Sequence, residues 1–148
     1  MSYKYTYDYE EKAYEAPKLK TDRSALKFIL LNTLTLGIYS IIFFIPLAFD
    51  LDKVAPKTDR SKTLNYLFAW ILALFTFNIV IDIWHYMISS RVSEALSVRG
   101  IDYEFGTQDF WGWFILGSLI LIGPYVYVYR LCRAMNLLCE SYNEDPTV

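Results

Sequence analysis

Three long apolar stretches constrain this chain more than any other feature of its sequence. They cover residues 25–49, 64–87 and 110–129, and each reaches the roughly 20 residues that a helix needs to cross the ~30 Å hydrocarbon layer of a bilayer. Of the 148 residues, 55% are hydrophobic and 18% are aromatic, which exceeds what a soluble core of this size requires. The sequence therefore predicts an all-α integral membrane protein with three transmembrane helices.

The rest of the chain divides around these stretches. Residues 1–24 form a polar tail rich in tyrosine, residues 25–143 form a single membrane domain, and residues 144–148 form a second tail. Tyrosines alternate with other residues at positions 3, 5, 7 and 9, so the first tail is expected either to be mobile or to dock on headgroups or on another chain. Apolar residues at helical spacing over 130–143 predict a C-terminal amphipathic helix that lies along the membrane or packs under the bundle.

One polar phrase, KTDRS, occurs twice, at residues 20–24 and 57–61. Its threonine, aspartate and serine side chains can accept hydrogen bonds from the free amides of a helix start, and its arginine can rest at headgroup level. We expect a helix cap and an anchor at each copy, on opposite faces of the bilayer because one span separates them. The alternative is contact with lipid phosphates, with the candidate residues Thr21, Arg23, Ser24, Thr58, Arg60 and Ser61.

Small residues mark the first two predicted helices. Thr33 and Gly37 lie four residues apart in the first, and Ala69 and Ala73 lie four residues apart in the second. This spacing lets helix backbones approach closely in lipid, so we expect these faces to pack on each other or on a second copy of the chain. In the third helix, the Gly-Pro pair at residues 123–124 predicts a bend.

The side chains needed for most catalytic and metal sites are missing. The chain has one histidine and two cysteines, no CxxC pair and no glycine-rich phosphate loop, so zinc sites, nucleotide loops and catalytic triads lack their parts. Cys132 and Cys139 are expected to be free thiols, since seven helical residues span about 10 Å, too far for a disulfide. They can serve as buried apolar residues or as acylation sites near the membrane. We expect no enzyme activity, no cofactor and no metal.

Charge excludes another class of function. The net charge is −2 and no basic run exceeds two residues, which argues against binding of nucleic acid.

One cluster of polar side chains remains in the apolar part: Asn78, Asp82 and His85 share one face of the second predicted helix. An ionisable residue inside a membrane is a candidate for proton or ion handling. The alternative is an aspartate and a histidine at headgroup level.

Three longer segments of the sequence are distinctive: KTDRSALKFILLNTLTLGIYSI, RGIDYEFGTQDFWGW and ILGSLILIGPYVYVYRLCRAMNLLCESYN. In these segments the chain resembles a bacterial family of small membrane proteins defined as domain of unknown function 4234. The resemblance implies a multi-pass protein of the bacterial plasma (inner) membrane, and it implies no activity.

Two functions of different class follow from these observations. The first is a non-enzymatic membrane protein that acts through helix packing, with membrane lipids, a second copy or another membrane protein as its partners. The second is a small ion or proton transporter, or a channel component, that uses Asp82 and His85. An enzyme acting on lipid is a more distant third.

Overall fold

The computed structural model describes residues 16–56 and 62–147. Within them the fold is all-α, as predicted. The elements are α1 (Ala25–Leu34), α2 (Tyr39–Val54), α3 (Tyr66–Ala73), α4 (Ile79–Val98), α5 (Thr107–Asp109), the π-helical η1 (Phe110–Ile115), the 3₁₀-helical η2 (Leu116–Ile120) and α6 (Gly123–Glu144).

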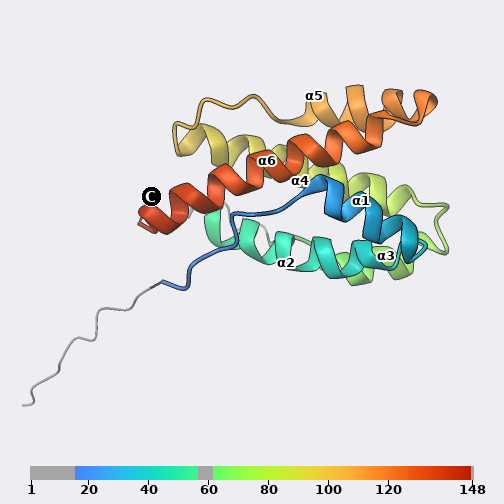
Figure 1. The fold of residues 1–148 in the computed structure, drawn as a ribbon, viewed down its shortest axis with the longest axis horizontal. Coiled ribbons are helices and arrows are strands. Elements are labelled where there is room, and N and C mark those ends of the chain that lie inside the picture. The colour runs from blue at the N-terminus through green and yellow to red at the C-terminus, as the bar shows by residue number, and fades with distance from the viewer. Residues whose placement is uncertain (1–15, 57–61, 148) are drawn as a thin grey trace, which may run out of the picture.

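These elements pair along the chain as helical hairpins. The first hairpin joins α1 to α2, the second joins α3 to α4, and the third joins the run α5, η1 and η2 to α6. Figure 1 shows that the turns of all three hairpins lie at one end of the molecule, on the right, while the described ends of the chain lie at the opposite end. We call these the turn end and the polar end.

The prediction of three continuous helices over residues 25–49, 64–87 and 110–129 is wrong, because the chain reverses inside each of them. The reversals fall between α1 and α2, between α3 and α4, and between η2 and α6. An α-helix requires right-handed backbone, and the residues with positive φ at these reversals are Leu36, Gly37, Phe77, Asn78 and Leu121. Among the described residues, no helix combines the length and the apolar composition that crossing a membrane would demand.

The first reversal also changes the expected position of the KTDRS copies. Arg23, just before α1, forms an ion pair with Asp50 near the end of α2, and the Thr63 amide donates to Asp52 Oδ1 over 3.0 Å. The described residues that precede and follow the first hairpin therefore lie at the same end of the molecule, which differs from the predicted separation of the two flanks of this segment, while the placement of the copies on opposite faces of a bilayer stays a prediction. Residues 57–61, with Thr58, Arg60 and Ser61, lie outside the described residues.

The amphipathic helix predicted over residues 130–143 is the C-terminal part of α6. Its apolar face, formed by Leu131, Met135 and Leu138, is fully buried in the bundle, so of the two predicted arrangements the structure has the one in which this helix packs against the other helices. Gly123 and Pro124 begin α6 directly after the third reversal. Proline is tolerated there because the first helical amides have no acceptor within the helix.

The core lies between α2, α4 and α6. Large side chains with less than 2% exposure come from all three helices, among them Leu47, Leu51, Ile88, Val92, Leu131, Met135 and Leu138. Cys132 and Cys139 are buried in the same core as free thiols, which confirms the prediction that they form no disulfide.

Two asparagines of α6 hold the segment before α1. Asn143 accepts from the Leu19 amide over 2.6 Å and donates to the Leu19 carbonyl over 2.8 Å. Asn136, one heptad earlier on the same face, makes the same pair of bonds with Arg23, both at 3.0 Å. A backbone segment without secondary structure needs such partners when it lies against a protein surface. The first KTDRS copy therefore has a fixed position beside α6.

Close packing of two glycines shapes the third hairpin. A Cβ added to Gly123 would lie 2.2 Å from Gly117 Cα and 2.2 Å from the Trp113 carbonyl oxygen. Only residues without a side chain allow η2 and α6 to approach this closely.

The predicted small-residue faces differ in their environments. Ala69 and Ala73 are buried inside the fold. Thr33 is exposed, and Gly37 lies in the first turn, where a Cβ would meet nothing within 4 Å. The two pairs therefore do not pack on each other as one interface within this chain.

Candidate functional site

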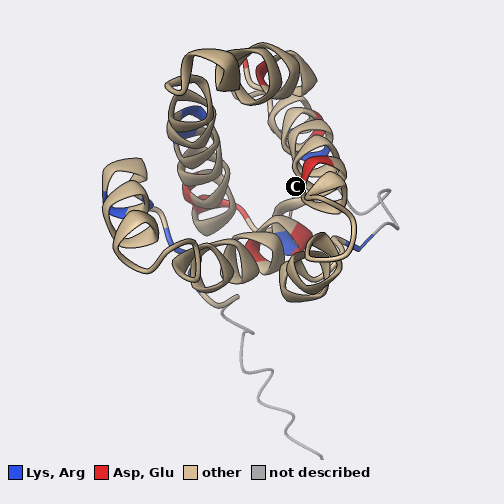
Figure 2. Cartoon of the chain, turned by 90° about the vertical axis from the view of Figure 1, so that its right-hand side faces the viewer, with Lys and Arg blue, Asp and Glu red and all other residues tan. Residues whose placement is uncertain are grey.

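The turn end is covered by exposed apolar side chains. Leu36 is 94% exposed, Phe77 is 96% exposed and Leu121 is 78% exposed, one from each hairpin. Their exposed apolar neighbours at the same turns are Leu34, Ile38, Leu74, Phe75, Leu119, Ile120 and Ile122. These turns contain no charged residue, so they are tan throughout in Figure 2, which views the molecule from this end. Large contiguous apolar surfaces of this kind mark interaction sites.

Backbone conformation singles out the same three residues. Leu36, Phe77 and Leu121 have φ angles of 52°, 50° and 62°, in the left-handed region that bulky residues seldom adopt. Each such residue costs about 1–3 kcal/mol, and strain of this kind clusters at functional sites. Each hairpin thus presents a large apolar side chain at a position where glycine or asparagine would fit the backbone better.

Ion pairs between hairpin segments mark where the apolar part ends. Among the described residues, Arg23 pairs with Asp50, Arg91 with Asp52 at 2.6 Å, and Arg130 with Asp109 at 2.5 Å. At 1.5 Å per residue, Asp50 lies about 17 Å along α2 from its first residue, Arg91 about 18 Å along α4, and Arg130 about 10 Å along α6. The part of the bundle between the turns and these pairs is therefore about 10–18 Å deep.

Asp82 is a charged residue inside this part, as is Lys27 in the first turn of α1. Asp82 lies one turn into α4, beside an open apolar groove of about 410 Å³. The other residues that line the groove are Ile79, Ile83, Tyr86, Phe110, Trp111 and Ile115. Burial raises the pKa of the Asp82 carboxyl above its usual value.

His85 lies in the protein core instead of a polar channel. Its ring is 3% exposed and packs against the rings of Phe44, Trp84, Phe114 and Tyr127. The Tyr127 hydroxyl lies 3.4 Å from His85 Nδ1. Burial lowers the pKa of His85 to about 3, so the ring is neutral at physiological pH.

The three residues predicted to form a relay therefore lie in three different environments. Asn78 is exposed in the second turn, Asp82 borders the groove and His85 lies in the core. The Asp82 amide donates to the Asn78 carbonyl over 3.2 Å as part of the first turn of α4, but among the described residues no side-chain hydrogen bond or ion pair joins Asp82 to Asn78 or His85. The relay stays a prediction.

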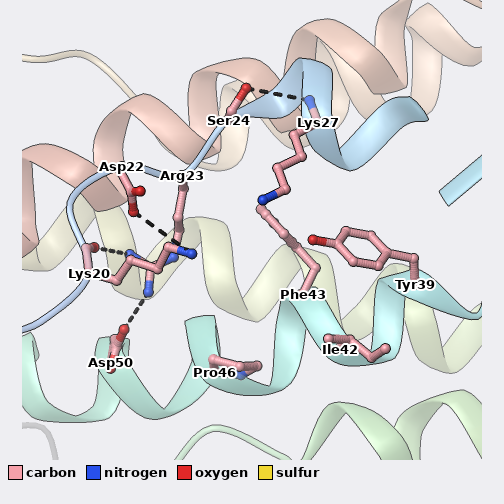
Figure 3. A pocket seen from close by; sticks show the side chains of 10 residues that line it. All are labelled: Lys20, Asp22, Arg23, Ser24, Lys27, Tyr39, Ile42, Phe43, Pro46 and Asp50. Atoms are coloured by element: carbon pink, nitrogen blue, oxygen red, sulfur yellow. Dashed lines mark hydrogen bonds and ion pairs between the residues drawn. The ribbon is translucent and has the colours of Figure 1, made fainter. Parts of the chain in front are cut away.

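A cavity of about 280 Å³ opens between the start of α1 and the outer face of α2. Figure 3 shows its residues: Lys20, Asp22, Arg23, Ser24 and Lys27 come from the segment before α1 and its first turn, and Tyr39, Ile42, Phe43, Pro46 and Asp50 come from α2. One wall is therefore polar and mostly basic, and the other is mainly apolar. The cavity lies at the boundary between the apolar part and the ion pairs.

Arg23 is a structural member of this cavity. Its side chain is 4% exposed. The guanidinium group pairs with Asp50 and donates to the Lys20 carbonyl over 2.5 Å and to Cys139 Sγ over 3.5 Å. These bonds neutralise the charge of Asp50 and hold the polar wall of the cavity in place. Lys20 lies 3.8 Å from Asp22, in a pair with both side chains more than half exposed, which contributes little.

Lys27 supplies positive charge that the cavity does not neutralise. Within the described residues it forms no ion pair, and its ammonium group extends into the space that the Tyr39 hydroxyl also faces (Figure 3). It lies in the first turn of α1, where the helix dipole is already positive. A second cavity of about 280 Å³ on the other side of residues 23–26 adds Arg133 of α6.

Only some of the residues predicted to contact headgroups line the two cavities. Ser24 lines both cavities and caps α1, accepting from the Lys27 amide over 3.4 Å. Arg23 lines them but is engaged by Asp50, and Thr21 lines neither cavity. Sequence reasoning missed Lys27 and Tyr39. The spacing of Lys27 from the cap residue Ser24 was the one available signal, since it places the lysine in the first helical turn.

Comparison with known proteins gives one match. Residues 23–94 match the family described as Domain of unknown function (DUF4234), which confirms the predicted resemblance over the first two hairpins. No curated protein and no solved structure matches the chain.

Proposed function

We propose that the chain, whose residues 23–94 carry this family domain, is a non-enzymatic membrane protein that inserts its turn end into one leaflet of a bilayer. The three hairpins enter and leave on the same side, and the polar end remains at that membrane surface. The membrane is the one that the family resemblance implies, the bacterial plasma membrane.

The observation that carries this proposal is the set of exposed, left-handed apolar residues at the three turns. Burying a leucine or phenylalanine side chain contributes about 1.5–3 kcal/mol. Leu36, Phe77 and Leu121 are exposed enough to gain most of that each, and a lipid environment would offset the strain in their backbones.

The depth of the apolar part supports insertion into a single leaflet. The ion pairs lie about 10–18 Å from the turns along their helices, and half of the ~30 Å hydrocarbon layer is about 15 Å. Insertion to this depth places the ion pairs near the headgroups. It also brings Asp82 into lipid, and the raised pKa of its carboxyl favours entry in the protonated form.

Association with a partner in the membrane is a further part of the proposal. The open surface around Thr33 and Gly37 lies at the first turn, where small residues let another helix approach closely. This face can receive a second copy or another membrane protein within the same leaflet.

The test distinguishes inserted hairpins from membrane-spanning helices by determining on which side of the bilayer the flanking residues are accessible. In a chain with Cys132 and Cys139 replaced by alanine, single cysteines are placed at Lys18, Lys53 and Glu144, which flank the first and third hairpins and are exposed. Proteoliposomes are then treated with a membrane-impermeant maleimide before and after permeabilisation.

One-leaflet insertion predicts that, in each oriented preparation, the three cysteines share the same accessibility. Three spans predict that the cysteine at Lys18 reacts from the side opposite to those at Lys53 and Glu144. That second pattern would overturn the proposal, as would a protein that fails to associate with vesicles.

A further inference from the structure

We propose that the cavity between α1 and α2 binds the phosphodiester of an anionic phospholipid, with Lys27 as the charged contact and the lipid chain lying on α2. This inference rests on the proposed membrane insertion, and it names the lipid class that the polar end selects.

Charge in the cavity favours an anion. Its lining contains the basic residues Lys20, Arg23 and Lys27 against Asp22 and Asp50. The buried Arg23–Asp50 pair neutralises itself, and Lys20 and Asp22 lie together at the solvent edge. The surplus charge is that of Lys27, which stands in the positive first turn of a ten-residue helix without an acidic partner among the described residues. A bound anion would neutralise both the lysine and the helix dipole.

The shape of the cavity favours a lipid over a small anion. Opposite the lysines lie Ile42, Phe43 and Pro46 of α2 (Figure 3), and Ile42 is 64% exposed. These side chains continue from the cavity toward the turn end. A ligand with a phosphate at one end and an acyl chain at the other matches both walls, whereas a free phosphate would leave the apolar wall uncovered.

The position of the cavity along the bundle gives a further reason to expect a lipid phosphate. The cavity lies beside Arg23 and Asp50, about one leaflet depth from the first turn. Inserted as proposed, the chain would hold this opening at the level of the headgroups, where lipid phosphates are found.

The test measures preference for anionic lipid in two lysine variants. Full-length protein is partitioned onto vesicles of phosphatidylcholine and onto vesicles containing phosphatidylglycerol, at about 0.5 M salt to screen diffuse attraction. Lys27→Gln removes the proposed contact. Lys62→Gln is the matched control, because Lys62 is also exposed near the polar end, next to Thr63, and lines none of the cavities described above.

We expect wild-type protein to bind both kinds of vesicle and to favour phosphatidylglycerol. Lys27→Gln should reduce that preference about fivefold or more, the effect of roughly 1 kcal/mol per basic residue near an anionic surface, while Lys62→Gln should change it less than twofold. Equal effects of the two substitutions would overturn the inference and leave membrane insertion intact. Failure of the wild-type protein to bind either vesicle would instead overturn the proposed function.

A competition experiment distinguishes binding of a lipid phosphate from binding of a water-soluble phosphate ester. Soluble glycerol phosphate in the millimolar range should leave the lipid preference unchanged if the acyl chain contributes to binding. Loss of the preference under this competition would assign the cavity to water-soluble phosphate esters and overturn its assignment to lipid. Native mass spectrometry after release from mixed-lipid nanodiscs gives a second readout, with retained phosphatidylglycerol expected for wild type and reduced retention for Lys27→Gln.

Discussion

Replacing Phe77 by aspartate tests how much one hairpin turn contributes to membrane binding. Phe77 is 96% exposed and has a φ of 50°. Aspartate adopts left-handed backbone more readily than phenylalanine, so the substitution removes the apolar side chain without an added backbone cost. The folded protein should therefore keep its stability in water, and the change should act on the membrane-bound state.

The expected loss follows from two contributions. Removing the phenylalanine forfeits about 2 kcal/mol of burial in lipid. Bringing a carboxylate to the depth of the turn costs up to about 3 kcal/mol, and less where the headgroups or water reach it. A total of about 4 kcal/mol corresponds to a roughly thousandfold weaker partition onto neutral vesicles, since every 1.4 kcal/mol is a factor of ten.

Vesicle flotation with phosphatidylcholine measures this partition directly. Val98→Asp is the matched control, because Val98 is the last residue of α4, is 52% exposed and lies at the polar end. It introduces the same charge on an exposed apolar position without entering lipid in the proposed arrangement. The reasoning would be refuted if Val98→Asp weakened binding as much as Phe77→Asp, or if Phe77→Asp bound as tightly as the natural chain.

Three further predictions concern the interior. Gly123→Ala should lower the free energy of unfolding by at least 1–3 kcal/mol, because its Cβ would lie 2.2 Å from Gly117 Cα; Gly112→Ala, whose Cβ meets nothing within 4 Å, should show no such overpacking loss in the same denaturation assay. Since burial lowers the pKa of His85 to about 3, the unfolded chain takes up a proton below pH 6.5 while the folded chain does not. Stability should fall by about 1.4 kcal/mol per pH unit toward pH 3 and stay constant above pH 6.5, and His85→Phe should remove this slope in thermal melts; an unchanged slope contradicts the assignment. Cys132, whose pKa burial raises to about 12, should react with maleimide far more slowly in folded than in unfolded protein, and equal rates would contradict its burial.

Hydrophobic patterning located the three helical regions but could not show that each reverses. Leucine favours helix, and neither Phe77 nor Leu121 is a residue type that indicates left-handed backbone. Gly37 and Asn78 are residue types that commonly end a helix in this conformation, but one such residue inside a long apolar run did not outweigh its helical pattern. An apolar run long enough to span a membrane therefore has the same composition as two shorter helices with an apolar turn, and the difference depends on tertiary packing.

Part of the cavity between α1 and α2 could be predicted from the sequence, because some of its residues follow local rules for a helix start. Ser24 is a cap residue by type, and Arg23 belongs to the same phrase, so local rules placed both at the start of α1. Their partners come from α2 and α6: Asp50 binds Arg23, and Asn136 holds its backbone. Such contacts join residues more than 25 positions apart, and single-sequence patterns carry no information on them.

The bonds between Leu19 and Asn143 have a consequence for how the protein is made. They join residues 124 positions apart, so the backbone of Leu19 lacks these partners until α6 has been synthesised. At about 5–20 residues per second, that interval lasts roughly 6–25 s. During it the first two hairpins exist without the helix that completes the polar end. The order of synthesis therefore makes α6 the element that closes the structure, and truncation before it should leave a chain that is degraded rather than a smaller working protein.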